Sequence, residues 1–295
     1  MLLTVNELEV RYGHQTALRI DQPIGFEAGD RVGIIGSNGA GKTTLIKSIL
    51  GITDYKGNIA TKLQPEQIGV HMQFNEYVST MKVKHIMETI LGTKISKNRK
   101  LQELIAYFEF EACLSKKFQA LSGGQKQRFT IILVMFQNAP FTIYDEVTSG
   151  LDFETRQRLM EKLVDWYDGK DNTLLVVSHY YEELERLADK ILLLDHGRVV
   201  AFGGKKELFD RYCGGAVYIL DRNETNEKLT AGFTLLKSPE HLLAVSCRQE
   251  SEEKRAVSLF LENKVNFRRS DCDIELMSIN AKARFYEKEG MRNEG

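Results

Sequence analysis

A glycine-rich loop constrains this sequence more than any other feature. It satisfies the pattern G-x-x-x-x-G-K-[ST] with the run Gly36-Ser37-Asn38-Gly39-Ala40-Gly41-Lys42-Thr43-Thr44. An apolar run at 31–35 precedes it, and a run with helical spacing at 43–50 follows. Inward-turned backbone amides and the N-terminal dipole of the following helix hold phosphate at such a loop. Lys42 would neutralise outer phosphates and the Thr43 hydroxyl would suit Mg²⁺, so the loop predicts a nucleoside-triphosphate site.

Composition narrows the class of protein further. The 295 residues allow one large domain, or a large domain with a small appendage. Forty Lys and Arg against 41 Asp and Glu give a net charge of −1, so no nucleic-acid partner is expected. The longest uncharged apolar stretch, around 131–136, is far below the roughly 20 residues of a membrane span, and residues 1–9 do not resemble a signal peptide. We expect a cytoplasmic protein.

The four cysteines form no CxxC pair and predict neither a zinc site nor a disulfide framework. They lie far apart in the sequence, and we expect all four to be buried, reduced thiols: Cys113, Cys213, Cys247 and Cys272.

The apolar pattern predicts an α/β fold. Short strands at 2–10, 17–20 and 24–26 indicate an N-terminal antiparallel β region. Apolar runs at 31–35, 141–144, 173–177 and 191–194 alternate with helical patterns, which favours a mostly parallel sheet covered on both faces. Between 76 and 118 only helical spacing occurs, so a helical subdomain is expected at about 76–135.

The pattern of apolar residues changes near residue 205. Strands are predicted at 216–220, 242–247 and 273–279, and a helix at 252–261. We therefore expect two domains, a nucleotide-binding domain at 1–210 and a small accessory α/β domain at 211–295.

Two carboxylates end the apolar run at 141–144. Asp145 at the end of a strand beside a phosphate loop can hold Mg²⁺, and Glu146 can polarise a water for attack on a phosphate. Alone, such a pair is more often a solvated strand end. Beside the phosphate loop, the catalytic interpretation is favoured.

The run Leu121-Ser122-Gly123-Gly124-Gln125 allows two interpretations. Ser122 and Gln125 match a capping box for a helix at 126–136. A cap does not need two glycines, each of which costs a helix about 1 kcal/mol relative to alanine. They are explained if a ligand approaches the amides at this helix start, which makes the run a second anion site. The origin of that second phosphate is open at this point.

In order and spacing, these motifs resemble the ATP-binding cassette (ABC) ATPases over about residues 1–210, with 121–125 as the family signature. The resemblance implies roles for residues that would be unremarkable alone. Tyr12 matches the aromatic that stacks on adenine, and Gln73 the Q-loop glutamine that touches Mg²⁺ and senses a membrane partner. Asp145 and Glu146 match the Walker B pair. Asp152 matches the D-loop, and His179 the switch histidine at the γ-phosphate.

The resemblance also implies a mechanism. Two cassettes pack head to tail, so that Ser122, Gly123, Gly124 and Gln125 of one close over ATP and Mg²⁺ bound in the other. Glu146, His179 and Lys42 are then the catalytic residues. The second cassette is another copy of this chain or a related one. One departure is visible, because Val147 stands where the family usually has proline, and a small effect on D-loop rigidity is expected.

The expected task is energy coupling in a transporter. The chain would dock through 76–118 and Gln73 on separate transmembrane permease subunits, peripheral on the cytoplasmic face. The region after residue 205 resembles the extension of bacterial exporters, which favours export. The alternative is a soluble cassette acting on a non-membrane partner, although translation factors carry two cassettes and chromosome proteins a long coiled coil, neither seen here. An ATPase that only binds nucleotide is disfavoured by Glu146 and His179.

Overall fold

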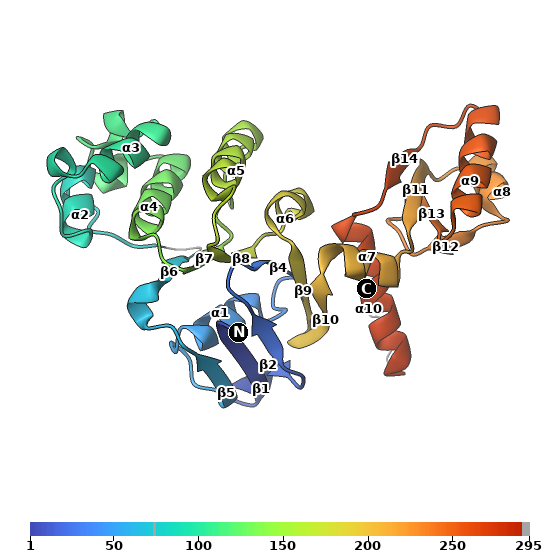
Figure 1. The fold of residues 1–295 in the computed structure, drawn as a ribbon, viewed down its shortest axis with the longest axis horizontal. Coiled ribbons are helices and arrows are strands. Elements are labelled where there is room, and N and C mark those ends of the chain that lie inside the picture. Colours follow the sequence, from blue (N-terminus) through green and yellow to red (C-terminus); the bar gives the residue numbers. More distant parts are fainter. Residues whose placement is uncertain (73–74, 291–295) are drawn as a thin grey trace.

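The computed structural model describes residues 1–72 and 75–290 (Figure 1). Its larger sheet has the order β3-β1-β2-β10-β9-β4-β8-β7-β6, and β5 pairs with β1. The strands are β1 (Leu3–Tyr12), β2 (Gln15–Ile20), β3 (Ile24–Phe26), β4 (Arg31–Ile35), β5 (Lys56–Thr61), β6 (Ile68–His71), β7 (Phe141–Asp145), β8 (Thr173–Val177), β9 (Lys190–Asp195) and β10 (Arg198–Gly204). From β9 to β6 all neighbours are parallel, whereas β1 pairs antiparallel with β2, β3 and β5. Both predicted parts of this sheet are confirmed.

The central strands are buried on both faces, as their continuous apolar runs predicted. In β8, Leu175 and Val177 point to the cluster that contains α1 (Lys42–Ile49). Leu174 and Val176 point to the opposite cluster, which contains α5 (Phe153–Tyr167) and α6 (Tyr181–Leu187). The alternation follows from the two-residue period of a strand. The carboxyl ends of these strands carry the candidate catalytic residues.

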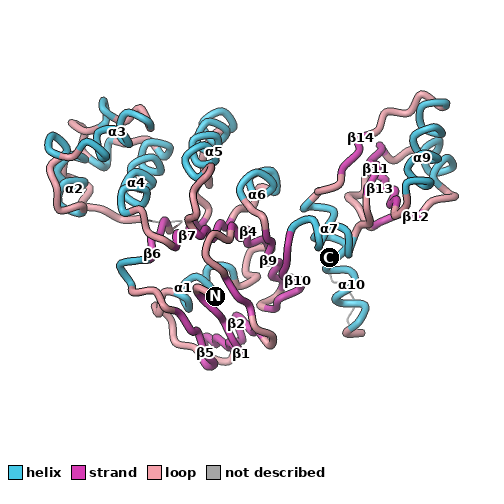
Figure 2. Tube along the Cα trace, viewed as in Figure 1, coloured by secondary structure: helices cyan, strands magenta, loops and turns pink. Residues whose placement is uncertain are grey.

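The segment at 76–118 is helical, as predicted (Figure 2). It contains α2 (Val83–Ile90) and α3 (Arg99–Tyr107) and leads into α4 (Gly123–Gln137). The helix predicted at 126–136 begins three residues earlier, because Ser122 is its N-cap and both glycines therefore lie in its first turn.

A second, antiparallel sheet forms near the C-terminus in the order β12-β13-β11-β14. Its elements, which follow α7 (Lys205–Tyr212), are β11 (Ala216–Asp221), α8 (Glu224–Thr230), β12 (Thr234–Leu236), β13 (Leu242–Cys247), α9 (Glu250–Glu262) and β14 (Arg268–Ser270). This chain order and strand order define the split β-α-β arrangement. On one face Tyr218 and Val245 pack with Phe260 of α9. On the other, Val217 and Ile219 join the cluster of α10 (Ile274–Lys288).

The strand predicted at 273–279 is wrong, because these residues begin α10. The Asp273 carboxylate accepts a hydrogen bond from Leu276 N at 2.9 Å and caps the helix. Ile274, Met277 and Ala281 recur at helical spacing and are all buried. Only Ile274 and Met277 of this series lie within 273–279, and Ala281, which continues it, lies beyond the predicted segment. The edge strand is instead β14, whose three residues carry no apolar side chain.

Two further expectations concern burial. Cys113, Cys213 and Cys247 are buried free thiols, but Cys272 is partly exposed, so that prediction is wrong for one of the four. Cys272 lies in the turn between β14 and α10, outside the three apolar clusters. Among the described residues, no helix combines the length and the apolar character that crossing a membrane requires.

Candidate functional site

The glycine-rich loop joins β4 to α1 and is held closed by its own lysine. Lys42 Nζ donates to the carbonyl oxygens of Gly36 and Ser37 at 2.8 and 3.1 Å. Burial lowers the pKa of Lys42, while Glu146 and Asp145 act in the opposite direction. Gly41 has φ +101°, and a Cβ there would lie 3.0 Å from Leu18 Cδ1, so only glycine fits.

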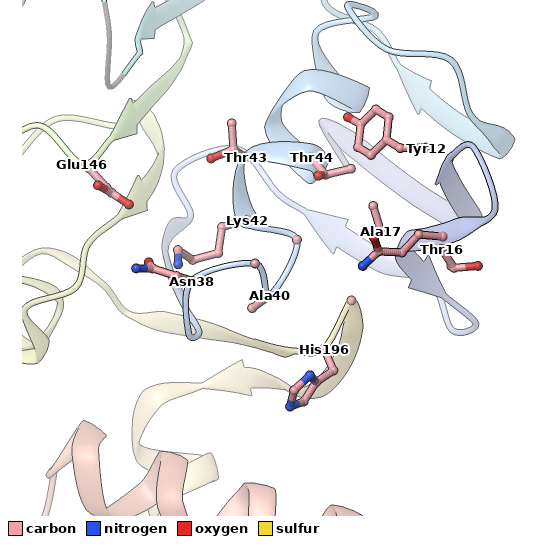
Figure 3. A pocket seen from close by; sticks show the side chains of 14 residues that line it. Tyr12, Thr16, Ala17, Asn38, Ala40, Lys42, Thr43, Thr44, Glu146 and His196 are labelled. Atoms are coloured by element: carbon pink, nitrogen blue, oxygen red, sulfur yellow. The ribbon is translucent and has the colours of Figure 1, made fainter. Parts of the chain in front are cut away.

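A cavity of about 620 Å³ opens above this loop (Figure 3). Tyr12 and Glu146 stand on opposite sides of it. Of the residues predicted for the site, it is lined by Tyr12, Asn38, Gly39, Ala40, Gly41, Lys42, Thr43, Thr44 and Glu146. Tyr12 is half exposed, and its hydroxyl lies 3.5 Å from Thr53 Oγ1. An exposed ring at the cavity rim is able to stack on a base.

Sequence reasoning missed one wall of the cavity. This wall is formed by Gln15, Thr16, Ala17, His196 and Gly197. The only available signal was the pair His196-Gly197, which reads as a turn. A Cβ at Gly197 would lie 2.8 Å from the carbonyl oxygen of Ala17, so glycine lets this turn pack directly on β2.

Asp145 and Thr43 form an oxygen-rich pair below the loop. Thr43 Oγ1 lies 3.5 Å from Asp145 Oδ2, and Oδ1 is buried without a hydrogen-bond partner in the described chain. Burial, reinforced by Glu146, raises the pKa of Asp145 to about 6. No cluster of three or more His, Cys, Asp or Glu that could hold a metal occurs among the described residues. Hard oxygen donors that leave coordination positions for phosphate fit Mg²⁺, which is usually bound through one or two carboxylates.

Glu146 and His179 pair directly although 33 residues separate them. His179 Nε2 lies 2.7 Å from Glu146 Oε1. Glu146 has φ +51°, a conformation uncommon outside glycine, and its amide donates to the carbonyl oxygen of Val177 at 3.0 Å. Such held backbone strain is typical of functional positions. His179, with Asp145, does not line the cavity itself.

Asp152 and the signature lie outside this cavity. Asp152 caps α5, accepting hydrogen bonds from the amide and the hydroxyl of Thr155 at 3.0 and 2.8 Å. Ser122 and Gln125 form the predicted capping box of α4. A Cβ at Gly124 would crowd Thr155 Cγ2 at 3.1 Å, whereas a Cβ at Gly123 would meet nothing within 4 Å. Packing within the chain therefore explains the second glycine but not the first.

Two other predicted residues complete the account. Val147, which stands at the position of the expected proline, is buried in the apolar cluster that contains α5 and α6. Gln73 lies outside the described residues.

Comparison with known proteins identifies the family. A family model described as ABC transporter matches residues 23–149. The tungstate uptake system ATP-binding protein TupC of Peptoclostridium acidaminophilum is 31% identical over 210 residues, 68% of this chain and 97% of that protein. The Nod factor export ATP-binding protein I of Rhizobium sp. (strain N33) is 31% identical over 63% of this chain and 66% of its own. A solved ATP-binding subunit of an ABC transporter superposes with a TM-score of 0.65 at 26% identity, covering 72% of this chain and 93% of that one.

The chain belongs to the ABC transporter family, as one of its ATP-binding subunits. It is an ATPase with the cassette fold. The cavity above the phosphate loop is accordingly its candidate ATP site.

Proposed function

We propose that this chain is the energy-coupling subunit of an exporter, working as a head-to-tail dimer with ATP between the two cassettes. The exposed N-terminus of α4 carries the proposal. Ser122, Gly123 and Gly124 do not line the chain's own cavity, yet Gly123 leaves open space at the positive end of a 15-residue helix. A phosphate held by another chain explains that space.

The residues of the cavity support hydrolysis by in-line attack of water on the γ-phosphorus. Glu146 accepts a proton from that water, and its pairing with His179 at 2.7 Å fixes the direction of its carboxylate. Lys42 and the loop amides stabilise charge on the phosphate oxygens. Thr43 and Asp145 would hold Mg²⁺, which would supply positive charge to offset the negative charge of the phosphates. The signature amides of the second cassette complete the enclosure.

The proposed partners are separate permease subunits in a membrane, with this chain peripheral on the cytoplasmic face. Residues 76–118 together with Gln73 form the proposed docking region. The two relatives described above serve transport in opposite directions. We propose export because the region after residue 205 resembles the C-terminal extension of bacterial exporters. We also propose the division into domains at 1–210 and 211–295, since the second sheet begins at Ala216.

The first test is Glu146→Gln. We expect ATP affinity to be retained and turnover to fall at least about 100-fold, the usual contribution of a general base. The variant should also accumulate as an ATP-dependent dimer in size-exclusion chromatography. Lys42→Ala is the matched variant for binding. Its affinity for ATP, measured by calorimetric titration, should be weaker than that of the parent. Glu146→Gln turning over ATP at the parental rate would remove the catalytic assignment.

The second test concerns the partner. When the chain is purified from its native cells in mild detergent, a polytopic membrane protein should co-purify with it. Recovery of a ribosome or another non-membrane complex instead would favour the alternative function.

A further inference from the structure

The turn between β9 and β10 forms a wall of the ATP cavity and packs directly against the phosphate loop. Gly197 N donates to the carbonyl oxygen of Ala40 at 3.2 Å. Just before the turn, Ser37 Oγ lies 3.4 Å from Asp195 Oδ1. A Cβ at Gly36 would lie only 2.4 Å from the Leu194 carbonyl oxygen. The loop therefore touches the end of β9 at two points and the turn at one, so a displacement of this strand end and its turn displaces the loop.

On its opposite side, this turn contacts α10. Lys282 Nζ lies 2.8 Å from Asp195 Oδ1, and the Tyr286 hydroxyl donates to Asp195 Oδ2 at 2.6 Å. Just after the turn, Arg198, the first residue of β10, forms a bidentate ion pair with Glu289. Figure 3 shows a helix of the C-terminal region beneath His196. The Asp195 side chain is only 7% exposed, so its charge depends on these partners.

The charge on Asp195 is stabilised mainly from α10. Burial by itself would raise the pKa of this carboxyl group. Hydrogen bonds from Lys282 and Tyr286, together with the charges of Lys282 and His196, outweigh burial, and the pKa of Asp195 lies below its ordinary value. Removing either donor leaves a buried carboxylate with fewer partners, and Ser37 of the phosphate loop is the neighbouring hydroxyl able to compensate.

Helix α10 is in turn fixed to the second sheet. The Asn280 side chain accepts from Lys237 N at 3.1 Å and donates to Lys237 O at 2.9 Å, just after β12. Lys237 Nζ also pairs with Glu287 at 3.2 Å. The C-terminal unit, α10, Asp195 and the phosphate loop therefore form one continuous series of contacts.

We propose that Lys282 and Tyr286 are positioning residues of the ATP site, acting through Asp195 to hold the phosphate loop and its neighbouring turn ready for nucleotide. This assigns the C-terminal unit a role in ATP affinity. The inference rests on the proposed ATP site but not on the dimer, the membrane partner or the direction of transport.

The test compares Lys282→Met and Tyr286→Phe with the parent, using the full chain. We expect the dissociation constant and the KM for ATP to rise about five- to tenfold, the lower range of couplings between linked sites, with kcat changed less than about twofold. Lys282→Arg should restore affinity because it keeps the charge near Asp195. Lys288→Met is the control, since Lys288 is exposed on the same helix.

Stability measurements separate positioning from a structural role. A lower melting temperature with unchanged ATP affinity in both variants would overturn the inference. If Lys282→Met fails to fold, Tyr286→Phe, which loses only a hydroxyl, decides alone. Weaker binding in Lys42→Ala but not in these variants would leave the proposed site intact and reject only the inference. Unchanged binding in Lys42→Ala would instead reject the site.

Discussion

His71, at the end of β6, is buried as a neutral ring. It is fully buried, and its ring centroid lies 6.2 Å from that of Tyr144. Neither ring nitrogen has a hydrogen-bond partner in the described chain, although the nearby Gln127 favours the protonated form. Burial dominates and lowers the pKa of His71 from 6.5 to about 4. The residue therefore affects stability rather than charge at neutral pH.

This burial predicts a specific pH dependence. Between pH 6.5 and 4 the unfolded chain binds a proton at His71 that the folded chain does not. The free energy of unfolding therefore falls as the pH falls through this window, by about 3 kcal/mol in total. His71→Gln, which cannot titrate, should lose less stability over the same window in urea denaturation. The exposed His85→Gln is the control. Identical pH profiles for His71→Gln and the parent would contradict the assignment.

At the scale of an element, the start of α4 separates a glycine that packing within the chain explains from one that it does not. Gly123→Ala enters open space and replaces a poor helix former, so stability should be unchanged or higher by up to about 1 kcal/mol. ATP-dependent dimerisation should nevertheless weaken, because the new methyl group obstructs the approach of a phosphate. Gly124→Ala, the matched variant, crowds Thr155 and should melt at a lower temperature than Gly123→Ala. Wild-type dimerisation of Gly123→Ala, measured by light scattering with ATP, would count against the head-to-tail arrangement.

At the scale of the whole molecule, one apolar cluster joins the two sheets. It includes Leu174 and Val176 of β8, Val217 and Ile219 of β11, and Met277 of α10. Because the C-terminal unit shares its packing with the ATPase core, we expect the two to unfold together. The same cluster fixes α10, the helix whose Lys282 and Tyr286 contact Asp195.

The corresponding prediction is a single calorimetric transition. Fluorescence of Trp166, the one tryptophan, reports on α5 in the ATPase core, and it should change together with the far-ultraviolet circular dichroism. Met277→Ala removes packing between the sheets and should lower the free energy of unfolding by about 2–5 kcal/mol. The midpoint temperature of both signals should fall with it. Two resolved transitions, with the Trp166 midpoint unmoved by Met277→Ala, would show independent units.

Some helices and strands could be predicted from the sequence and others could not, for physical reasons. The central strands were predictable because burial on both faces requires continuous apolar runs, as in β7 and β8. The pattern of β5 carries almost no apolar residue, and this strand is stabilised by pairing with β1, which local sequence does not reveal. In the same way, β14 is polar and α10 resembles a strand over its first turns.

What the sequence alone determined is the local chemistry: the phosphate loop, the capping box of α4, the carboxylates that end β7, and the buried strands. Each depends on residues within a few positions of one another, whose spacing fixes backbone geometry. Tertiary structure alone decided the pairing of Glu146 with His179, the cavity wall at His196 and the ion pair between Lys282 and Asp195. These contacts join residues 33 to more than 80 positions apart, or different elements, and their geometry follows from packing of the entire fold.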